Sequence, residues 1–130
     1  YYFEDYEAEY FPAAKDDRTS LHKKQTGRIM ICSKSLLFTP ENTKYPVIRF
    51  LYDNMVGCGK WNGELLKLLP LNAQLFVVRS EKKIEMKSGN QNHPYRFITG
   101  KQEYRFNLKF ESLVNFLPKI QNLIRISQLF

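Results

Sequence analysis

The chain has 130 residues, a length that fits one domain around a single core, and 43% of them are hydrophobic and 15% aromatic. This composition excludes a disordered chain, and no apolar run reaches the roughly 18–20 residues that span a bilayer. The net charge of +7 is uneven, because residues 1–17 hold six acids and one lysine, a net of −5 that leaves +12 on the rest. Such a surface favours an anionic partner, and lysines that simply keep the surface soluble are the alternative.

The beginning of the chain, YYFEDYEAEY, has neither the basic start nor the apolar stretch of a signal peptide. It also lacks an initial Met, so we expect a fragment of a longer protein. Cys32 and Cys58 belong to no CxxC or Cys/His cluster, which argues against zinc. We therefore expect two reduced thiols in a cytosolic protein.

A tight hairpin is predicted in the segment GRIMICSKSLLFTP. Ile29 and Ile31 recur with the period of a strand, and Leu36 and Phe38 repeat it after a turn near Lys34. Three later runs are expected to be strands: VIRFLYDNMV, LFVVR and the shorter KKIEMK.

A second hairpin is predicted in HPYRFITGKQEYRFNLKF, with its turn at Gly100-Lys101. On the return strand Tyr104, Phe106, Leu108 and Phe110 share one face, and polar residues share the other. Aromatic and basic residues that alternate in this way also occur in nucleic-acid-binding sheets. The strict alternation favours a buried core face over base stacking.

The period changes to that of a helix in ESLVNFLPKIQNLIRISQLF, with Ser112 as the predicted N-cap. Pro118 is expected to kink this helix or to delay its regular part. The chain is thus predicted to be mainly β with one C-terminal α-helix: residues 1–110 form a bent antiparallel barrel, and residues 111–130 cap it. The residues expected in the core are Ile29, Ile31, Leu36, Phe38, Tyr104, Phe106, Leu108, Phe116, Leu117, Ile120 and Ile124.

This order of elements is that of a pleckstrin-homology (PH) or GRAM domain. Three segments, YYFED, GRIMICSKSLLFTPE and HPYRFITGKQEYRFNLKF, resemble in sequence and order the N-terminal PH/GRAM-like domain of a family of BEACH and WD-repeat proteins, the factors associated with neutral sphingomyelinase activation. The resemblance implies a non-catalytic, membrane-proximal adaptor in signalling, sphingolipid metabolism or vesicle traffic. It also implies phosphoinositide binding and peripheral association of a cytoplasmic protein with membrane.

The usual PH signature for phosphoinositides is a lysine that ends the first strand and a [KR]-x-R motif on the second. Lys23, Lys24 and Arg28 occupy the corresponding loop and strand with a different spacing, which argues against stereospecific headgroup binding. We predict instead a weak electrostatic site for anionic membrane. Its candidate residues are Lys15, Arg18, Lys23, Lys24, Arg28 and Lys34.

No catalytic site, metal or cofactor is expected. His22 and His93 have no carboxylate or nucleophile at a useful spacing, and the sequence holds no phosphate-binding loop, GxSxG or HExxH motif. The alternative function is a docking platform for neighbouring domains of the same chain or for a signalling protein, through a groove between helix and sheet edge. Binding to RNA or DNA is the least favoured of the three.

The apolar segment GKWNGELLKLLPL, which contains Trp61, leaves three possibilities. A lone tryptophan among leucines at mixed spacing favours packing in the core or on the flank of the barrel. Contact with another domain comes next, because interfaces favour aromatic anchors. Insertion into a bilayer is the third.

Overall fold

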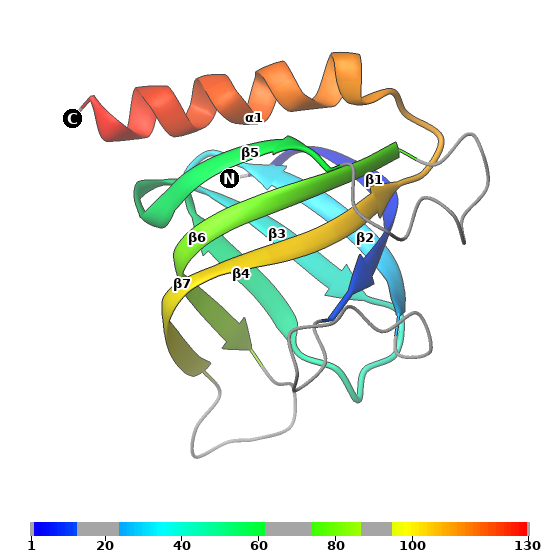
Figure 1. Ribbon diagram of the computed structural model, residues 1–130. Helices are drawn as coiled ribbons and strands as arrows, with labels where there is room; N and C mark the ends of the chain where they lie inside the picture. The colour runs from blue at the N-terminus through cyan, green and yellow to red at the C-terminus, as the bar shows by residue number, and fades with distance from the viewer. Residues whose placement is uncertain (1, 13–23, 62–73, 87–94, 130) are drawn as a thin grey trace.

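The computed structural model describes residues 2–12, 24–61, 74–86 and 95–129, with only the backbone at residues 2, 3, 95–97 and 101. Within these ranges the chain forms seven strands, a one-turn 3-10 helix and one α-helix (Figure 1). The strands are β1 Tyr2–Phe11, β2 Gln25–Cys32, β3 Ser35–Pro40, β4 Val47–Leu51, β5 Met55–Lys60, β6 Gln74–Met86 and β7 Tyr95–Leu108. The 3-10 helix η2 spans Tyr52–Asn54, and α1 spans Leu113–Gln128.

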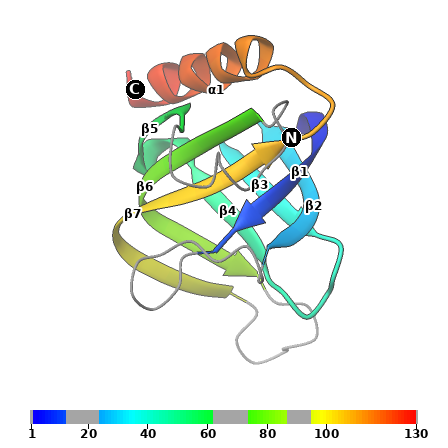
Figure 2. The same ribbon diagram turned by 45° about the vertical axis from the view of Figure 1, so that its right-hand side comes forward.

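The described strands form an antiparallel sheet that closes into a barrel. Their order is β4-β3-β2-β1-β7-β6-β5, and β4 also pairs with the second half of β6, which closes the ring. α1 lies across one end of the barrel and packs on β5 and η2 (Figures 1 and 2). At the opposite end, here called the open end, β1 stops, β2 starts and β3 connects to β4. The predicted fold, a bent antiparallel barrel capped by a C-terminal helix, is confirmed.

The predicted hairpin of β2 and β3 is present, and the glycine and proline that flank it lie opposite each other. Gly27 pairs with Pro40. A Cβ atom on Gly27 would lie 2.2 Å from the carbonyl oxygen of Thr39, far inside van der Waals contact. Since only glycine allows the two backbones to come this close, Gly27 helps to fix the register of the hairpin.

The hairpin predicted around Gly100 is wrong. Residues 95–108 form one strand, β7, and its antiparallel partner is β6 along both of their halves. Between the pairs Ser80–Gln102 and Lys82–Thr99, β7 advances three residues while β6 advances two, so β7 contains a bulge. Gly100 lies in this bulge with a φ of 113°. A bulge of this kind bends and twists the pair of strands and does not reverse the chain.

Two further strand boundaries differ from the predicted ones. The runs LFVVR and KKIEMK are one continuous strand, β6, and the run VIRFLYDNMV is divided by η2 into β4 and β5. β6 pairs with β5 in its first half and with β4 in its second, so one bent strand serves both sides of the barrel. At the bend Glu81 and Lys82 are both exposed, which breaks the alternation that a straight strand would show.

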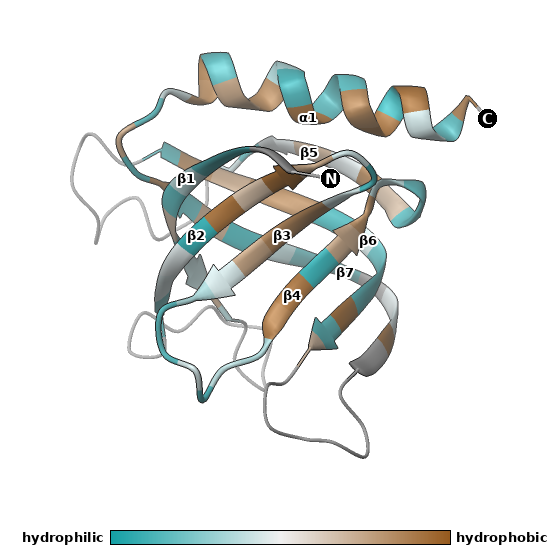
Figure 3. Cartoon of the chain, turned by 180° about the vertical axis from the view of Figure 1, so that it is seen from behind, coloured by the Kyte–Doolittle hydropathy of each residue, from teal (hydrophilic) through white to brown (hydrophobic). Residues whose placement is uncertain are grey.

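The core fills the barrel between the strands and α1. Phe106 lies at its centre, with ring centroids 5.0–6.2 Å from those of Tyr10, Phe38, Phe50 and Phe76. Buried and more exposed positions alternate along β2 from Gly27 onward and along β4. Figure 3 shows that both strands are largely hydrophobic, each with a hydrophilic band. The residues predicted to be buried are confirmed, apart from the half-buried Leu117: Ile29, Ile31, Leu36, Phe38, Tyr104, Phe106, Leu108, Phe116, Ile120 and Ile124.

Phe110 does not belong to the core face on which it was expected. β7 ends at Leu108, and the backbone of Phe110 has a φ of 60°. Its side chain is 89% exposed. The alternation of β7 therefore stops before Phe110, because the chain must turn there toward α1.

α1 begins where its cap predicts. The Ser112 side chain accepts a hydrogen bond from the N–H of Val114, and helical residues follow from Leu113. The helix continues through Pro118 without a break, so its regular part is not delayed (Figure 1). Pro118 is exposed, and so is Val114, the residue whose carbonyl has no N–H partner at the proline.

Candidate functional site

The structure places Lys24, Arg28 and Lys34 along one strand. Lys24 precedes β2 at the open end, Arg28 lies in its middle, and Lys34 follows it in the turn to β3. At about 3.3 Å per residue, Lys24 and Lys34 are separated by roughly 30 Å of chain. Lys34 lies beside η2, because its carbonyl accepts a hydrogen bond from the N–H of Tyr52 at 3.1 Å. The candidates therefore do not all meet in one patch, and Lys15, Arg18 and Lys23 lie outside the described residues.

Arg28 is engaged by the acidic outer face of β1. Its guanidinium donates a hydrogen bond to Asp5 at 2.8 Å and lies 3.9 Å from the carboxylate of Glu7, the residue directly opposite in the register. The side chains of Asp5 and Glu7, which are 31% and 50% exposed, hold Arg28 across the strand pair. Arg28 therefore stabilises the pairing of β1 with β2, which is a structural role that the sequence analysis did not assign to it.

Lys24 is held by a buried carboxylate. Its ammonium lies 2.9 Å from Glu9, whose side chain is 7% exposed, while that of Lys24 is 47% exposed. Glu9 also accepts a hydrogen bond from the amide of Asn107 at 3.0 Å, and Lys109 lies 4.0 Å away. Burial opposes ionisation of Glu9, but the hydrogen bonds from Lys24 and Asn107 and the charge of Lys109 outweigh it, so the pKa of Glu9 is lowered.

Glu9 is the residue of this site that sequence reasoning missed. The signal was present, because Asp5, Glu7 and Glu9 alternate along β1 and so share its outer face. Their partners depend on the register with β2, which places Glu9 opposite Thr26, next to the strand end at Lys24.

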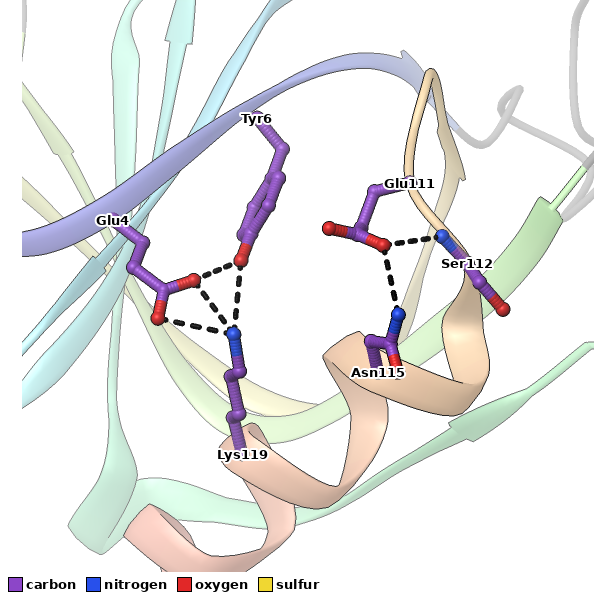
Figure 4. Close-up of polar contacts among 6 residues, drawn as sticks. All are labelled: Glu4, Tyr6, Glu111, Ser112, Asn115 and Lys119. Carbon is purple, nitrogen blue, oxygen red and sulfur yellow. Dashed lines mark hydrogen bonds and ion pairs between the residues drawn. The ribbon is translucent and has the colours of Figure 1, made fainter.

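At the α1 end, polar contacts join the helix to the strands (Figure 4). Lys119 donates to both carboxylate oxygens of Glu4, at 3.0 and 2.8 Å, and to the hydroxyl of Tyr6 at 3.2 Å. Tyr6 in turn donates to Glu4 and packs edge-on against the ring of Phe116. The hydrogen bonds from Lys119 and Tyr6 lower the pKa of Glu4. This cluster ties α1 to the first half of β1.

The groove expected between the helix and a sheet edge is bridged at β5. The side-chain amide of Gln121 donates to the carbonyl of Cys58 at 2.9 Å, and that of Gln128 donates to the carbonyl of Met55 at 2.7 Å. These two carbonyls belong to the edge strand of the sheet. Since glutamine side chains occupy them, an added peptide strand would first have to displace these contacts.

The segment around Trp61 is described only in part. Trp61 itself is half-buried, and its backbone N–H donates a hydrogen bond to the carbonyl of Leu75 at 3.0 Å. The guanidinium of Arg105 lies 5.2 Å from the centroid of the Trp61 ring. Trp61 thus packs on the flank of the barrel, as predicted. Leucines 65, 66, 68, 69 and 71 lie outside the described residues.

The described part of the chain holds two free thiols, one of them buried, and no group of metal ligands. In these ranges, no group of three His, Cys, Asp or Glu side chains is placed to hold a metal ion. Cys58 is buried, and its burial raises the pKa of the thiol to about 12; Cys32 is a half-buried free thiol. His22 and His93 are outside the described residues. No described helix is long and apolar enough to cross a membrane.

A closed antiparallel barrel of seven described strands with a single capping helix after the last one defines a PH-like domain, a class of non-catalytic modules that bind membranes or proteins. Among models of protein families, that of the FAN protein N-terminal PH domain matches residues 1–130. The chain therefore belongs to the family of N-terminal PH domains of FAN, the factor associated with neutral sphingomyelinase activation. The predicted family is confirmed.

Proposed function

We propose that this domain is an adaptor module that attaches a cytoplasmic BEACH and WD-repeat protein to anionic, phosphoinositide-containing membrane. The observation that carries the proposal is the position of Lys24, whose side chain is 47% exposed at the open end of the barrel. Lys15, Arg18 and Lys23 precede it in the same connection of the sequence. Each basic residue near an anionic surface contributes about 1 kcal/mol, so four of them support weak and reversible attachment.

The placement of Lys34 distinguishes two orientations on the membrane. If the open end faces the lipid, Lys24 contributes to binding and Lys34, beside η2, does not. If the outer face of β2 lies flat on the lipid, both lysines contribute, and Arg28 lies between them. We propose the first orientation, because Arg28 is already held by Asp5 and Glu7.

Sedimentation with vesicles tests this function. The lipids are phosphatidylcholine alone, with added phosphatidylserine, and with added phosphatidylinositol bisphosphate. Binding to the two anionic mixtures is expected at about 0.1 M salt and should be lost at about 1 M, since the Debye length falls from about 10 Å to about 3 Å. Lys23→Gln with Lys24→Gln should abolish it, and Lys34→Gln, in an exposed turn at the other end, is the matched control. Absence of binding to every anionic vesicle at low salt would overturn the proposal.

Docking of a protein partner is a second candidate function, and one feature favours it. Phe110, before α1, is 89% exposed with a φ of 60°, and Val114, in the first turn of α1, is 80% exposed. Exposed aromatic side chains are typical anchors of protein interfaces. Phe110→Ser with Val114→Ser should then weaken contact with the neighbouring domains of the full-length protein, measured by limited proteolysis, and leave vesicle binding unchanged.

A further inference from the structure

The cation that carries the proposed membrane site already has an anionic ligand inside the protein. Lys24 reaches solvent with about half of its side chain, yet its ammonium lies 2.9 Å from Glu9. A lipid phosphate that binds Lys24 must therefore compete with this carboxylate. The affinity of the site depends on the difference between two ion pairs and not on the strength of one.

Glu9 differs from the other acids on the outer face of β1. The side chains of Asp5 and Glu7 are 31% and 50% exposed, whereas that of Glu9 is 7% exposed. Asn107 holds its carboxylate by a hydrogen bond of 3.0 Å, and Asn107 is itself fixed by the N–H of Gln74 at 2.9 Å. Glu9 is therefore unable to follow Lys24 toward a membrane, and among the described residues it would keep Asn107 and the more distant Lys109.

We infer that Glu9 sets how tightly this site binds anionic surfaces, because it competes with them for Lys24. The inference rests on the proposed function. A buried carboxylate left with fewer partners opposes the transfer of Lys24, and this cost is the same for every anionic ligand. Glu9 thus weakens the binding of phosphatidylserine and of polyphosphorylated inositol lipids alike.

The variant Glu9→Gln tests this competition. The amide keeps the size of the side chain and one oxygen for Asn107, but it no longer competes for Lys24. Binding to phosphatidylserine vesicles should rise about two- to fivefold, the range for one partly exposed ion pair. Binding to phosphatidylinositol bisphosphate vesicles should rise by at least the same factor, because the competing carboxylate is removed in both cases. Glu7→Gln, which changes an exposed acid on the same face, is the matched control and should leave binding to both lipids nearly unchanged.

The outcomes separate the inference from the function on which it rests. If Glu9→Gln changes binding to neither lipid while Lys24→Gln weakens both, the inference is overturned and the membrane function stands. If no form of the chain binds anionic vesicles at low salt, the membrane function itself fails. Thermal unfolding shows whether Glu9→Gln folds. If Glu9→Gln does not fold, the carboxyl ¹³C resonance of Glu9 in the wild-type chain is followed during titration with short-chain phosphatidylinositol bisphosphate. A shift at saturation supports the inference, and an unchanged resonance overturns it.

Discussion

The two ends of the barrel hold their polar side chains in different ways. At the α1 end, Gln121 and Gln128 join the helix to backbone carbonyls of β5, and Lys119 joins it to β1. These contacts fix the helix over the core. At the open end, Lys24 is bound to Glu9 and yet half exposed. The comparison indicates that one end maintains the fold, while the other holds an accessible cation that, in the proposed function, exchanges its partner.

The largest effect is expected in the core beneath α1. Phe106 stacks on Phe76 at 5.3 Å, and Phe76 contacts Phe116 of α1 at 4.9 Å. Phe106→Ala should lower the free energy of unfolding by about 3–5 kcal/mol, because it removes a buried ring and leaves a cavity. Phe110→Ala is the matched control: this ring is 89% exposed, and its loss should change stability by less than about 0.5 kcal/mol. Urea denaturation measures both, and equal losses would contradict the central place of Phe106.

A smaller but still marked effect is expected in the β2–β3 hairpin, which joins the two ends. Gly27→Ala would place a Cβ atom 2.2 Å from the Thr39 carbonyl oxygen, so the strands must separate. A loss of about 1–3 kcal/mol is expected from such overpacking. An added Cβ at Gly59, on β5, meets nothing within 4 Å, and Gly59→Ala should be neutral or slightly stabilising. A stable Gly27→Ala variant in thermal unfolding would show that the two backbones have room to separate.

The glutamines of α1 give the next effect in size. Gln128→Ala leaves the carbonyl of Met55 without its side-chain donor, and Gln121→Ala does the same to Cys58. Each substitution should cost about 1 kcal/mol in denaturant titrations. Hydrogen exchange should quicken along β5 and not along β2. Asn122→Ala, on the exposed side of the same helix, is the control, and a loss as large as that for Gln128 would argue against the β5 contact.

Much of the α1 end could be predicted from the sequence because its signals are local. Ser112 is the N-cap of the helix, and the helical period places Phe116, Ile120 and Ile124 on the buried face. The sheet was harder to predict, since a glycine such as Gly100 is compatible with a turn or with a bulge. Only pairing with β6 decides between them, and that pairing depends on residues far apart in the chain.

The candidate site was harder to predict than the fold for a related reason. Crowding in the sequence suggested that Lys24 and Lys34 lie together, but an extended strand separates them. The length of the predicted strand was enough to show this. The ion pair of Lys24 with Glu9 could not be predicted from the strand length. It depends on the register of β1 and β2 and on the burial of Glu9 beside β7.

The smallest expected effect is acid destabilisation, and it compares the two ends directly. The pKa values of Glu4 and Glu9 are both lowered from an ordinary value of 4.5. A lowered pKa in the folded state means that the unfolded state binds more protons. The stability that each carboxylate contributes is therefore present above about pH 4.5 and is lost as the pH falls through the lower, folded pKa.

Salt should separate the two contributions. The side chains of Glu4 and Lys119 are 40% and 44% exposed, whereas that of Glu9 is 7% exposed. About 1 M salt screens an exposed pair and affects a buried one much less. Urea denaturation between about pH 7 and pH 3 is measured for the wild type, Glu4→Gln and Glu9→Gln. Both variants should flatten the loss of stability in acid at low salt. At high salt, Glu9→Gln should still differ from the wild type, while Glu4→Gln should become similar to it. If salt removes both differences equally, Glu9 is solvated in solution, and the contrast between a fixed and an exchangeable end loses its electrostatic basis.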